Sequence, residues 1–196
     1  ITQSGKLTVG GNTTARAASG DINLGSTANA FTGRVGLTGV NATLVDSTPL
    51  TLGTTTLSGT LAVTSGGNIT ASNSASGGNA DGGGAGLSVS YNLTTGAGNI
   101  TLTGYGQAGQ SWAEGIQITG NTLSTTTGNI TINGYGGNSN NGSYISGGVL
   151  FGGGNVNVYT TSGNISINGA SGATNNSHGI NFWGGATYAI YSTSGA

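Results

Sequence analysis

The sequence predicts an all-β fold in which short strands wind into a β-solenoid with about three strands per coil. Three observations lead to this prediction: a phrase that recurs along the chain, an alternation of apolar and polar residues, and an unusual composition. The 196 residues include 42 Gly, 1 Pro, no Cys and no Met, and only 4% of them are charged. Average globular domains contain roughly 25% charged residues and about 7% Gly.

The recurring phrase joins a Gly-Asn corner to a short strand. It reads GNITLTG at 98–104, GNITING at 128–134 and GNISING at 163–169, with a shorter version, GNIT, at 67–70. Its isoleucines lie 31, 30 and 35 residues apart. A repeat of this length is typical of a solenoid, in which each coil buries its apolar side chains against those of its neighbours.

Apolar residues alternate with polar ones inside each unit. Ile100 and Leu102 show this period, as do Ile116 and Ile118, and Gly or Asn residues bound the runs. Such short alternating runs indicate half-buried strands. Each complete unit also carries one variable loop rich in Gly, Asn and Ser. The units open at 86–89, 115–118, 148–151 and 179–182, and Thr- and Ser-rich stretches follow at 92–98, 122–128 and 158–163.

Residues 1–196 are expected to form one solenoid segment with two styles of coil. Residues 1–66 should coil tightly, whereas residues 67–196 should form coils of about 30 residues with inserted loops. In the tight part the apolar pairs are Leu7/Val9, Ile22/Leu24, Val35/Leu37, Leu50/Leu52 and Leu61/Val63.

This architecture accounts for the composition. Coil corners favour Gly and Asn, because we expect left-handed backbone there and because Asn side chains bond neighbouring backbone. Outward positions favour Thr and Ser, and a narrow core has no room for buried charge pairs. At about 25 to 30 residues per coil the chain makes roughly seven coils, a rod about 35 Å long at the strand spacing of about 4.8 Å.

Several other classes of protein do not fit. A helical bundle needs fewer Gly and Thr residues, collagen needs a three-residue Gly period, and a disulfide scaffold needs Cys. Nucleic-acid binding through phosphates is not expected, because the cations are Lys6, Arg16, Arg34 and, when protonated, His178. No segment has the roughly 20 continuous apolar residues of a membrane helix.

The repeat phrases resemble the large secreted exoproteins of the filamentous-haemagglutinin type, which are two-partner-secretion adhesins of Gram-negative bacteria. The resemblance rests on GNITLTGYG at 98–106, on GNITING at 128–134, and on the Leu-Thr-Val and Leu-Thr-Leu strands at 7–9 and 50–52. It covers nearly the whole chain and implies a right-handed parallel β-helix. It also implies export through an outer-membrane secretion partner, and a role in adhesion, aggregation or biofilm matrix. The repeat type has no catalytic motif, so no functional residue carries over.

The sequence at the two ends suggests a longer filament. When the ends are joined, STSGA at 192–196 followed by ITQSGKLTV at 1–9 continues the repeat. We expect this chain to be a fragment or one tandem repeat of a longer chain, stacked end to end with further copies or repeats of itself. Uncapped coil ends expose strand edges, which such stacking would cover.

Aromatic residues in the second half are candidates for contact with carbohydrate. Exposed rings can hold the apolar faces of sugars, but they can also pack inserted loops onto the coil, and packing is the favoured interpretation. The candidates share loop-end or C-terminal positions: Trp112, Tyr144, Phe182 and Trp183.

Glycosylation is a second possible use of the surface. Most Asn-x-Ser/Thr sequons coincide with the repeat phrase, where the Asn is interpreted as a corner residue. Asn141 and Asn175 lie in loops and are the better acceptor candidates.

Catalysis lacks a set of residues that could carry it. The acids are Asp21, Asp46, Asp81 and Glu114; the three aspartates are interpreted as isolated, solvated turn carboxylates, and His178 has no evident partner. No cofactor or metal is expected, because a calcium site needs several acidic oxygens and Asp81 alone does not supply them. The Thr-rich faces lack the regular Thr lattice that ice binding needs.

From the sequence we therefore expect a non-catalytic structural or adhesive stalk segment of a secreted surface filament or biofilm-matrix adhesin. Possible partners are host or matrix polysaccharide. The alternatives are a polysaccharide-processing enzyme, or a carbohydrate-binding or ice-binding module, on the same scaffold. An enzyme would need two or three acids or bases converging in one groove, and a binding module would need an exposed aromatic row or a regular Thr lattice.

Overall fold

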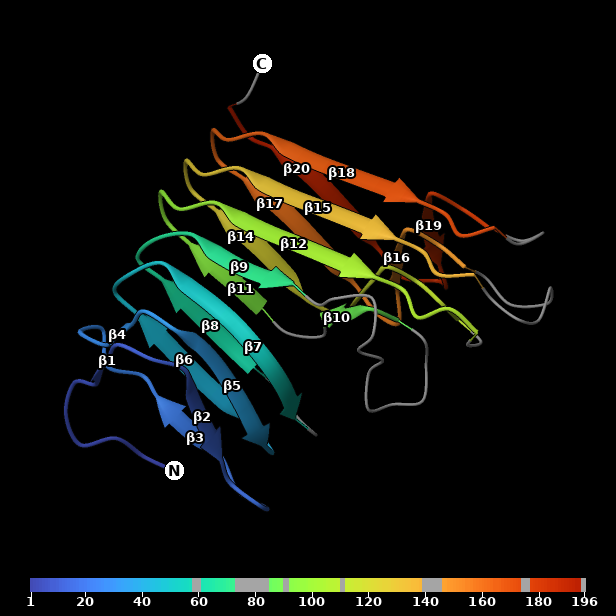
Figure 1. Cartoon of the computed structure of the whole chain (residues 1–196). Coiled ribbons are helices and arrows are strands. Elements are labelled where there is room, and N and C mark those ends of the chain that lie inside the picture. The colour runs from blue at the N-terminus through green and yellow to red at the C-terminus, as the bar shows by residue number, and fades with distance from the viewer. Residues whose placement is uncertain are drawn as a thin grey trace.

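The computed structural model describes residues 1–57, 61–72, 85–89, 92–109, 112–138, 146–173 and 177–194. In these residues the secondary structure is all β, with twenty short strands that rise in stacked coils from one end of the molecule to the other (Figure 1). The described part of the chain has no helix that could cross a membrane.

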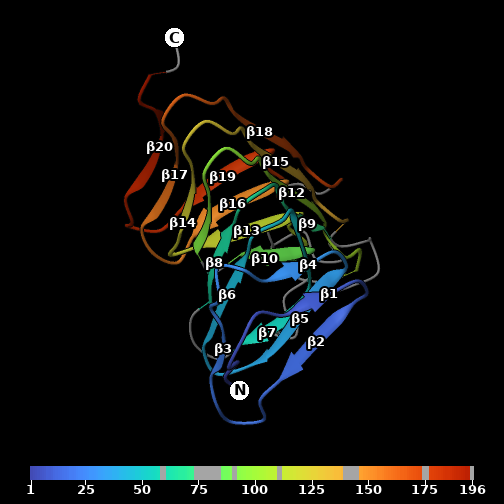
Figure 2. The same ribbon diagram turned by 90° about the vertical axis from the view of Figure 1, so that its left-hand side faces the viewer.

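Two seven-stranded sheets run the length of the solenoid (Figure 2). Sheet I consists of β2 (Thr13–Arg16), β5 (Arg34–Gly39), β7 (Leu50–Leu57), β9 (Ile69–Ser72), β12 (Ile100–Tyr105), β15 (Ile130–Tyr135) and β18 (Ile165–Ala170). Sheet II consists of β3 (Ile22–Leu24), β6 (Ala42–Asp46), β8 (Leu61–Ser65), β11 (Asn92–Thr95), β14 (Thr122–Thr125), β17 (Val156–Thr160) and β20 (Tyr188–Ser192). Seven strands in each sheet agree with the roughly seven coils that the sequence predicts.

Two shorter sheets supply the third strand of most coils. Sheet III consists of β10 (Leu87–Val89), β13 (Ile116–Thr119), β16 (Val149–Gly152) and β19 (Ile180–Trp183), and sheet IV of β1 (Thr8–Val9) and β4 (Ala30–Phe31). Every strand pair is parallel. The fold is therefore a parallel β-helix with about three strands per coil, as the sequence predicts.

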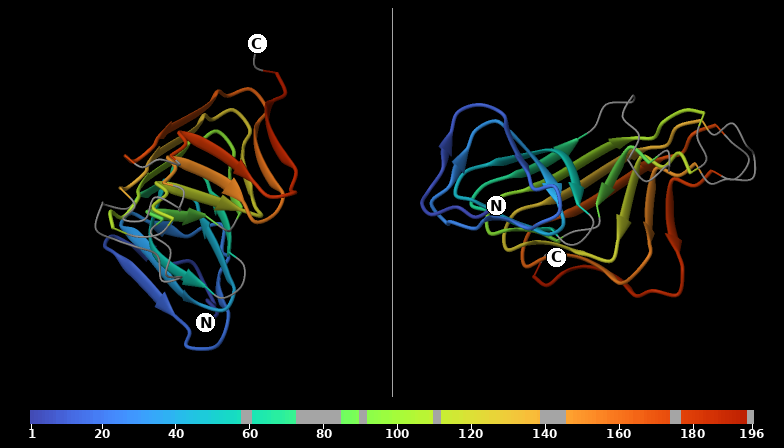
Figure 3. Two further views of the ribbon diagram at one scale, coloured as in Figure 1. Left: turned by 90° about the vertical axis from the view of Figure 1, so that its right-hand side faces the viewer. Right: turned by 90° about the horizontal axis from the view of Figure 1, so that it is seen from below.

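The third strand changes its place along the rod. In the first coils, β4 comes after β3 of sheet II and before β5 of sheet I, and β1 likewise comes between residues 1–3, which pair with β3, and β2 of sheet I. From β10 onward the strands of sheet III come after sheet I and before sheet II. Seen along the rod, the blue N-terminal coils and the yellow-green to red strands of sheet III lie toward opposite sides of the cross-section (Figure 3, right).

The register of sheet I confirms the alignment of the repeat phrases. Ile69, Ile100, Ile130 and Ile165 are consecutive partners on β9, β12, β15 and β18. The first three are fully buried, and they join the aliphatic core that runs through all the coils. The alternation predicted from the sequence is realised on β12, where Ile100 and Leu102 point inward and Thr101 and Thr103 outward.

The N-terminal coils are shorter than the later ones. Hydrogen bonds between equivalent corners there join residues 22, 20 and 17 positions apart, whereas the later corners are joined over 31, 30 and 35 positions. The extra residues of the later coils lie mainly in sheet III and in the connection that precedes it. The apolar pairs predicted between residues 7 and 63 coincide with strands of the structure. The same pattern does not identify β2, β4 and β6. In β2 and β6, Ala and Thr stand where larger apolar residues would be expected, and β4 is only two residues long.

One expectation about the corners is wrong. In the described residues, positive φ angles occur at Trp112 and at five glycines, 109, 120, 153, 154 and 184, but not at the repeated Gly-Asn corners. Those glycines are needed for space: a Cβ on Gly128 would overlap the carbonyl oxygen of Gly98, and one on Gly163 would overlap that of Gly128. Successive corners stack backbone on backbone, so a side chain is excluded without any left-handed turn.

Candidate functional site

The most unusual surface of the molecule is the open end formed by β18, β19 and β20. Each of these strands is the last of its sheet and pairs with a neighbour on one side only. Their inward rows are consequently uncovered: Phe182 is 49% exposed and Ile190 37% exposed, whereas their partners in the previous coil, Phe151 and Val158, are fully buried. We call this surface the open end.

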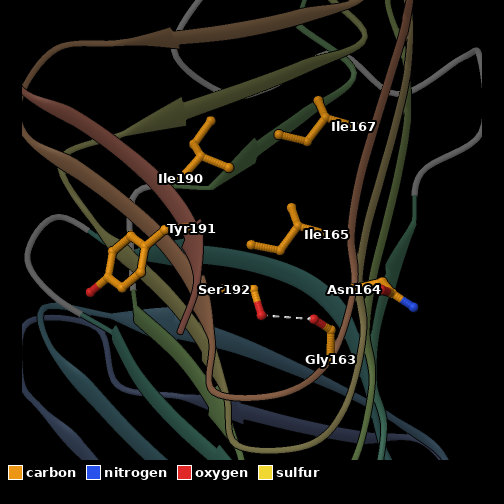
Figure 4. A pocket seen from close by; sticks show the side chains of 7 residues that line it. All are labelled: Gly163, Asn164, Ile165, Ile167, Ile190, Tyr191 and Ser192. Carbon is orange, nitrogen blue, oxygen red and sulfur yellow. Dashed lines mark hydrogen bonds between the residues drawn. The ribbon is translucent and has the colours of Figure 1, made fainter. Parts of the chain in front are cut away.

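A hollow of about 400 Å³ lies in the open end between sheets I and II (Figure 4). The isoleucine side chains of β18 and β20 extend into it, and the Ser192 hydroxyl donates a hydrogen bond to the Gly163 carbonyl at its rim (3.2 Å). In earlier coils the equivalent space holds the aliphatic side chains of the next coil. The residues that line the hollow are Gly163, Asn164, Ile165, Ile167, Ile190, Tyr191 and Ser192.

A ladder of asparagine side chains follows one corner of the rod and reaches the open end. The backbone N–H of Asn99 donates to Asn68 Oδ1 (2.9 Å), that of Asn129 to Asn99 Oδ1 (2.7 Å), and that of Asn164 to Asn129 Oδ1 (2.8 Å). Asn164 is the last member, and no described residue donates to its Oδ1. This ladder confirms the interpretation of the repeated Asn as a corner residue whose side chain bonds neighbouring backbone.

A buried hydroxyl column follows the corner where sheet II turns into sheet I. Its members occupy one register position, with Asp46 at the N-terminal end and Ser192 at the open end. Thr95 Oγ1 donates to the Gly67 carbonyl (2.8 Å), and Thr160 Oγ1 donates to that of Gly128 (3.2 Å). Each hydroxyl thus satisfies a corner carbonyl inside the rod, where an unpaired carbonyl would be costly. The hydroxyls of the column belong to Ser65, Thr95, Thr125, Thr160 and Ser192, and the Asp46 carboxylate occupies the same register position at the N-terminal end.

The described carbohydrate candidates contact other rings of the chain. The rings of Trp112 and Trp183 are 5.1 Å apart and tilted by 31°. Phe182 occupies an inward register position and stacks on Phe151, with ring centroids 5.0 Å apart. These contacts favour the packing interpretation. Tyr144, the fourth candidate, lies outside the described residues.

Leu150 lies on the outer face of sheet III and is nevertheless buried. It is 1% exposed, but it is not part of the main core, because it alternates with the inward residues Val149 and Phe151. Its Cγ and the Trp183 Cβ both lie 4.0 Å from where a Cβ on Gly152 would be. Trp183 Cβ and the Leu150 side chain therefore lie on the same, outward side of the sheet around Gly152.

Two tyrosine pairs stack along the rod. Tyr105 and Tyr135 are register partners at the ends of β12 and β15, and their rings are 4.8 Å apart with an interplanar angle of 10°. Tyr159 and Tyr191 are stacked on β17 and β20 at 5.5 Å. The rings face each other, so the faces within each pair are not available to a sugar.

The described aspartates act as corner acceptors. Asp21 Oδ1 accepts hydrogen bonds from the backbone and the side chain of Asn41, in the manner of the corner asparagines. Asp46 is 1% exposed, and its Oδ1 accepts from the backbone N–H and the hydroxyl of Thr48. The expectation of a solvated carboxylate is therefore wrong for Asp46, because the hydroxyl column places it inside the corner. Asp81, Asn141 and Asn175 lie outside the described residues.

Glu114 is an unusual acid that the sequence patterns did not single out. It is 1% exposed, and its Oε1 has no hydrogen-bond partner among the described residues. Burial raises the pKa of Glu114 to about 7, and a hydrogen bond from its own backbone N–H offsets only part of that increase. It directly follows Trp112 and Ala113, and Trp112 has the one positive φ angle, 60°, among the described non-glycine residues.

The position of Glu114 in the repeat explains why its burial was missed. Gly115, Gly148 and Gly179 are equivalent residues that directly precede the strands β13, β16 and β19 of sheet III. Glu114 lies one residue before Gly115, so the equivalent residues in the next two coils are Gly147 and His178. An acid that follows a loop reads as a surface residue in the sequence. Within the described ranges no three His, Asp or Glu side chains come together as a metal site.

Comparisons with known proteins bear on the N-terminal half of the chain. A family model described as repeats of unknown function (DUF5649) matches residues 1–38 and 39–107, more than half of the chain. No curated protein matches the chain. No solved structure matches it either. The chain belongs to the DUF5649 family of repeats of unknown function.

Proposed function

We propose that this chain is a structural and adhesive stalk segment of a secreted bacterial surface filament or biofilm-matrix adhesin, without a catalytic role. The observation that carries the proposal is the open end. There the aliphatic rows, the asparagine ladder and the hydroxyl column all reach a surface at which a further coil could continue them.

The internal construction supports a role as a stiff spacer. Each coil adds one strand to each long sheet, and parallel backbone ladders connect successive coils over the full length. Stability in such a repeat comes from contacts between neighbouring coils, so the rod lengthens by about 4.8 Å with each coil without changing its design.

The resemblance of the repeat phrases to filamentous-haemagglutinin-type exoproteins supports a location outside a Gram-negative cell. The proposal accordingly includes export through an outer-membrane secretion partner, and contact with host or matrix polysaccharide. The expected neighbours along the rod are further repeats. Nucleic acid is not a proposed partner, because Lys6, Arg16 and Arg34 are the only Lys and Arg residues of the chain.

An antibody raised against the 196-residue chain would test the location. We expect gold-labelled antibody to bind intact cells of the source bacterium or the matrix between them, and a strain lacking the gene to show no label. The deletion strain should also aggregate less and form less biofilm than its parent. Labelling that appears only after the cells are permeabilised would contradict the proposal.

A further inference from the structure

We infer that the open end fits a further coil of the type formed by β18, β19 and β20, and does not fit the N-terminal end of a second copy of the chain. The inference rests on the proposed stacking function and states which kind of coil stacks on the open end. It excludes direct end-to-end stacking of identical copies, because the two ends of this molecule carry different coils.

An occupant of the open end has to supply three strands. One must pair with each of β18, β19 and β20, because each has one unpaired side. Its inward side chains must fill the hollow over Ile165, Ile167 and Ile190, and its corner must bring a backbone N–H to Asn164 Oδ1. Charge does not guide the fit, because residues 146–194 contain no Lys, Arg, Asp or Glu.

The N-terminal coil cannot supply the strand that β19 needs. Its connection from sheet I to sheet II runs directly from β2 to β3, through residues 17–21, with no strand between them. The corresponding connection in the last coil, from β18 to β20, contains β19. A second copy docked by its N-terminal end would leave Ile180 and Phe182 uncovered at 40% and 49% exposure.

The mismatch also runs in the opposite direction. The third strand of the N-terminal coil, β1, lies between residues 1–3, which pair with β3 of sheet II, and β2 of sheet I. At the open end the corresponding connection, from sheet II to sheet I, is the tight corner between β17 and β18, residues 161–164, so β1 would find no strand to pair with.

The N-terminal end is also uneven in height. Residues 1–3 already pair with β3: the N–H of Asn23 donates to the Ile1 carbonyl (2.8 Å), and the N–H of Gln3 donates to the Asn23 carbonyl (3.3 Å). At the N-terminal end, sheet II therefore reaches further along the rod than sheet I, which ends at β2. A second copy docked by this end could not pair with β18 of sheet I and β20 of sheet II at the same time.

A coil of the C-terminal type fits because the molecule already contains that interface. The coil of β15, β16 and β17 meets the last coil in unbroken register, with Ile130 opposite Ile165, Val149 opposite Ile180, and Val158 opposite Ile190. The same residues, repeated once more, would bury these rows and give Asn164 its donor.

Two extended chains of equal length test the inference. In the first, Gly195 is followed by a second copy of residues 164–195. The added Asn164 then follows Gly195 as Asn164 follows Gly163 in the parent chain, so the repeat continues without a shift. In the matched control, Gly195 is followed by residues 12–43, which begin at the corresponding asparagine of the N-terminal coil but contain no sheet III strand. Hydrogen exchange is then measured by mass spectrometry in β18, β19 and β20, and sedimentation of the unextended chain is measured over a range of concentrations.

We expect the first extension to slow exchange by about tenfold or more in all three strands, and the control to leave β19 unchanged. The unextended chain should not form head-to-tail polymers. The inference is overturned if the control protects β19 as well as the first extension does, if the first extension protects none of the strands, or if copies of the unextended chain assemble with β19 protected. These results do not depend on whether the protein is displayed on cells, so failure of the proposed location would be recognised separately.

Discussion

At the scale of single residues, the corners show how a nearly uncharged chain satisfies its backbone. The two middle asparagines of the ladder, Asn99 and Asn129, each donate their own N–H to the coil before and accept an N–H from the coil after. Asp21 performs the accepting half of this task in the N-terminal part. What matters at the position is therefore a short side chain that ends in an oxygen acceptor.

Substitutions at Asn129 would test this explanation. Asn129→Ala removes the acceptor for the N–H of Asn164, and we expect it to lower the free energy of unfolding by about 1 kcal/mol, since water can reach this exposed corner. Asn129→Asp keeps the acceptor and should cost less than half as much. Urea unfolding followed by circular dichroism gives both values, and equal losses for the two variants would contradict the explanation.

Glu114 should make stability depend on pH near neutrality. Its pKa is raised from 4.5 to about 7 in the folded protein, so the folded state binds this proton more tightly than the unfolded state does. The stabilisation is full below pH 4.5 and is lost as the pH rises through 7, a change of about 3 kcal/mol. Unfolding free energies measured from pH 5 to pH 8 should fall accordingly.

Glu114→Gln should remove this dependence and be more stable than the parent at pH 8, because no charge then has to be buried. Asp21→Asn is the control, since it changes the net charge equally at a corner that already uses an amide elsewhere. Parallel pH curves for the parent and Glu114→Gln would show that Glu114 does not titrate with unfolding.

At the scale of strands and corners, close stacking of backbone explains the glycine content better than turn geometry does. Gly67, Gly98, Gly128 and Gly163 occupy equivalent corners, and each of the last three lies against the carbonyl of the one before. Gly96 belongs to the same turn as Gly98, but a Cβ there would have no neighbour within 4 Å.

These two environments provide a matched pair of substitutions. We expect Gly128→Ala to lower the free energy of unfolding by about 3 kcal/mol or to prevent cooperative folding, because the coils would have to separate. Gly96→Ala should change it by no more than about 0.5 kcal/mol. Thermal and urea unfolding of both proteins would measure the difference, and a tolerated Gly128→Ala would exclude close stacking as the reason for the glycine.

At the scale of the whole molecule, stability should be unevenly distributed. Coils in the middle have neighbours on both sides, whereas β18, β19 and β20 have one. In a linear repeat protein the ends therefore open at lower free energy than the centre. Hydrogen exchange should be slowest in β9 and β12, near the middle of the rod, and fastest in the outermost strands, β1 and β2 at one end and β18 to β20 at the other. Uniform protection along the rod would contradict this expectation.

Much of the architecture could be predicted because a solenoid repeats its contacts. The Asn-Ile phrase aligned Ile69, Ile100, Ile130 and Ile165 correctly, since equivalent residues of successive coils are also spatial neighbours. The strands β2 and β4 were missed because they have few large apolar residues and their pairing, not their composition, keeps them extended.

The candidate surface was less predictable, since it depends on contacts that no period relates. Trp112 and Trp183 come from different coils, yet their rings lie 5.1 Å apart, and nothing in their spacing along the sequence indicates this contact. From the sequence, Glu114 is expected to be a solvent-exposed loop residue, but in the structure the surrounding residues bury it.

The sequence by itself determined that the chain is a parallel solenoid of about seven coils with an uncharged aliphatic core, because period, alternation and composition act locally and repeat. Only the tertiary structure decided that the third strand changes from one side of the rod to the other, and hence that the two ends carry different coils. The physical reason is that a strand finds its place by pairing with the coils before and after it. The connection in which that pairing occurs depends on the whole stack and not on any single repeat.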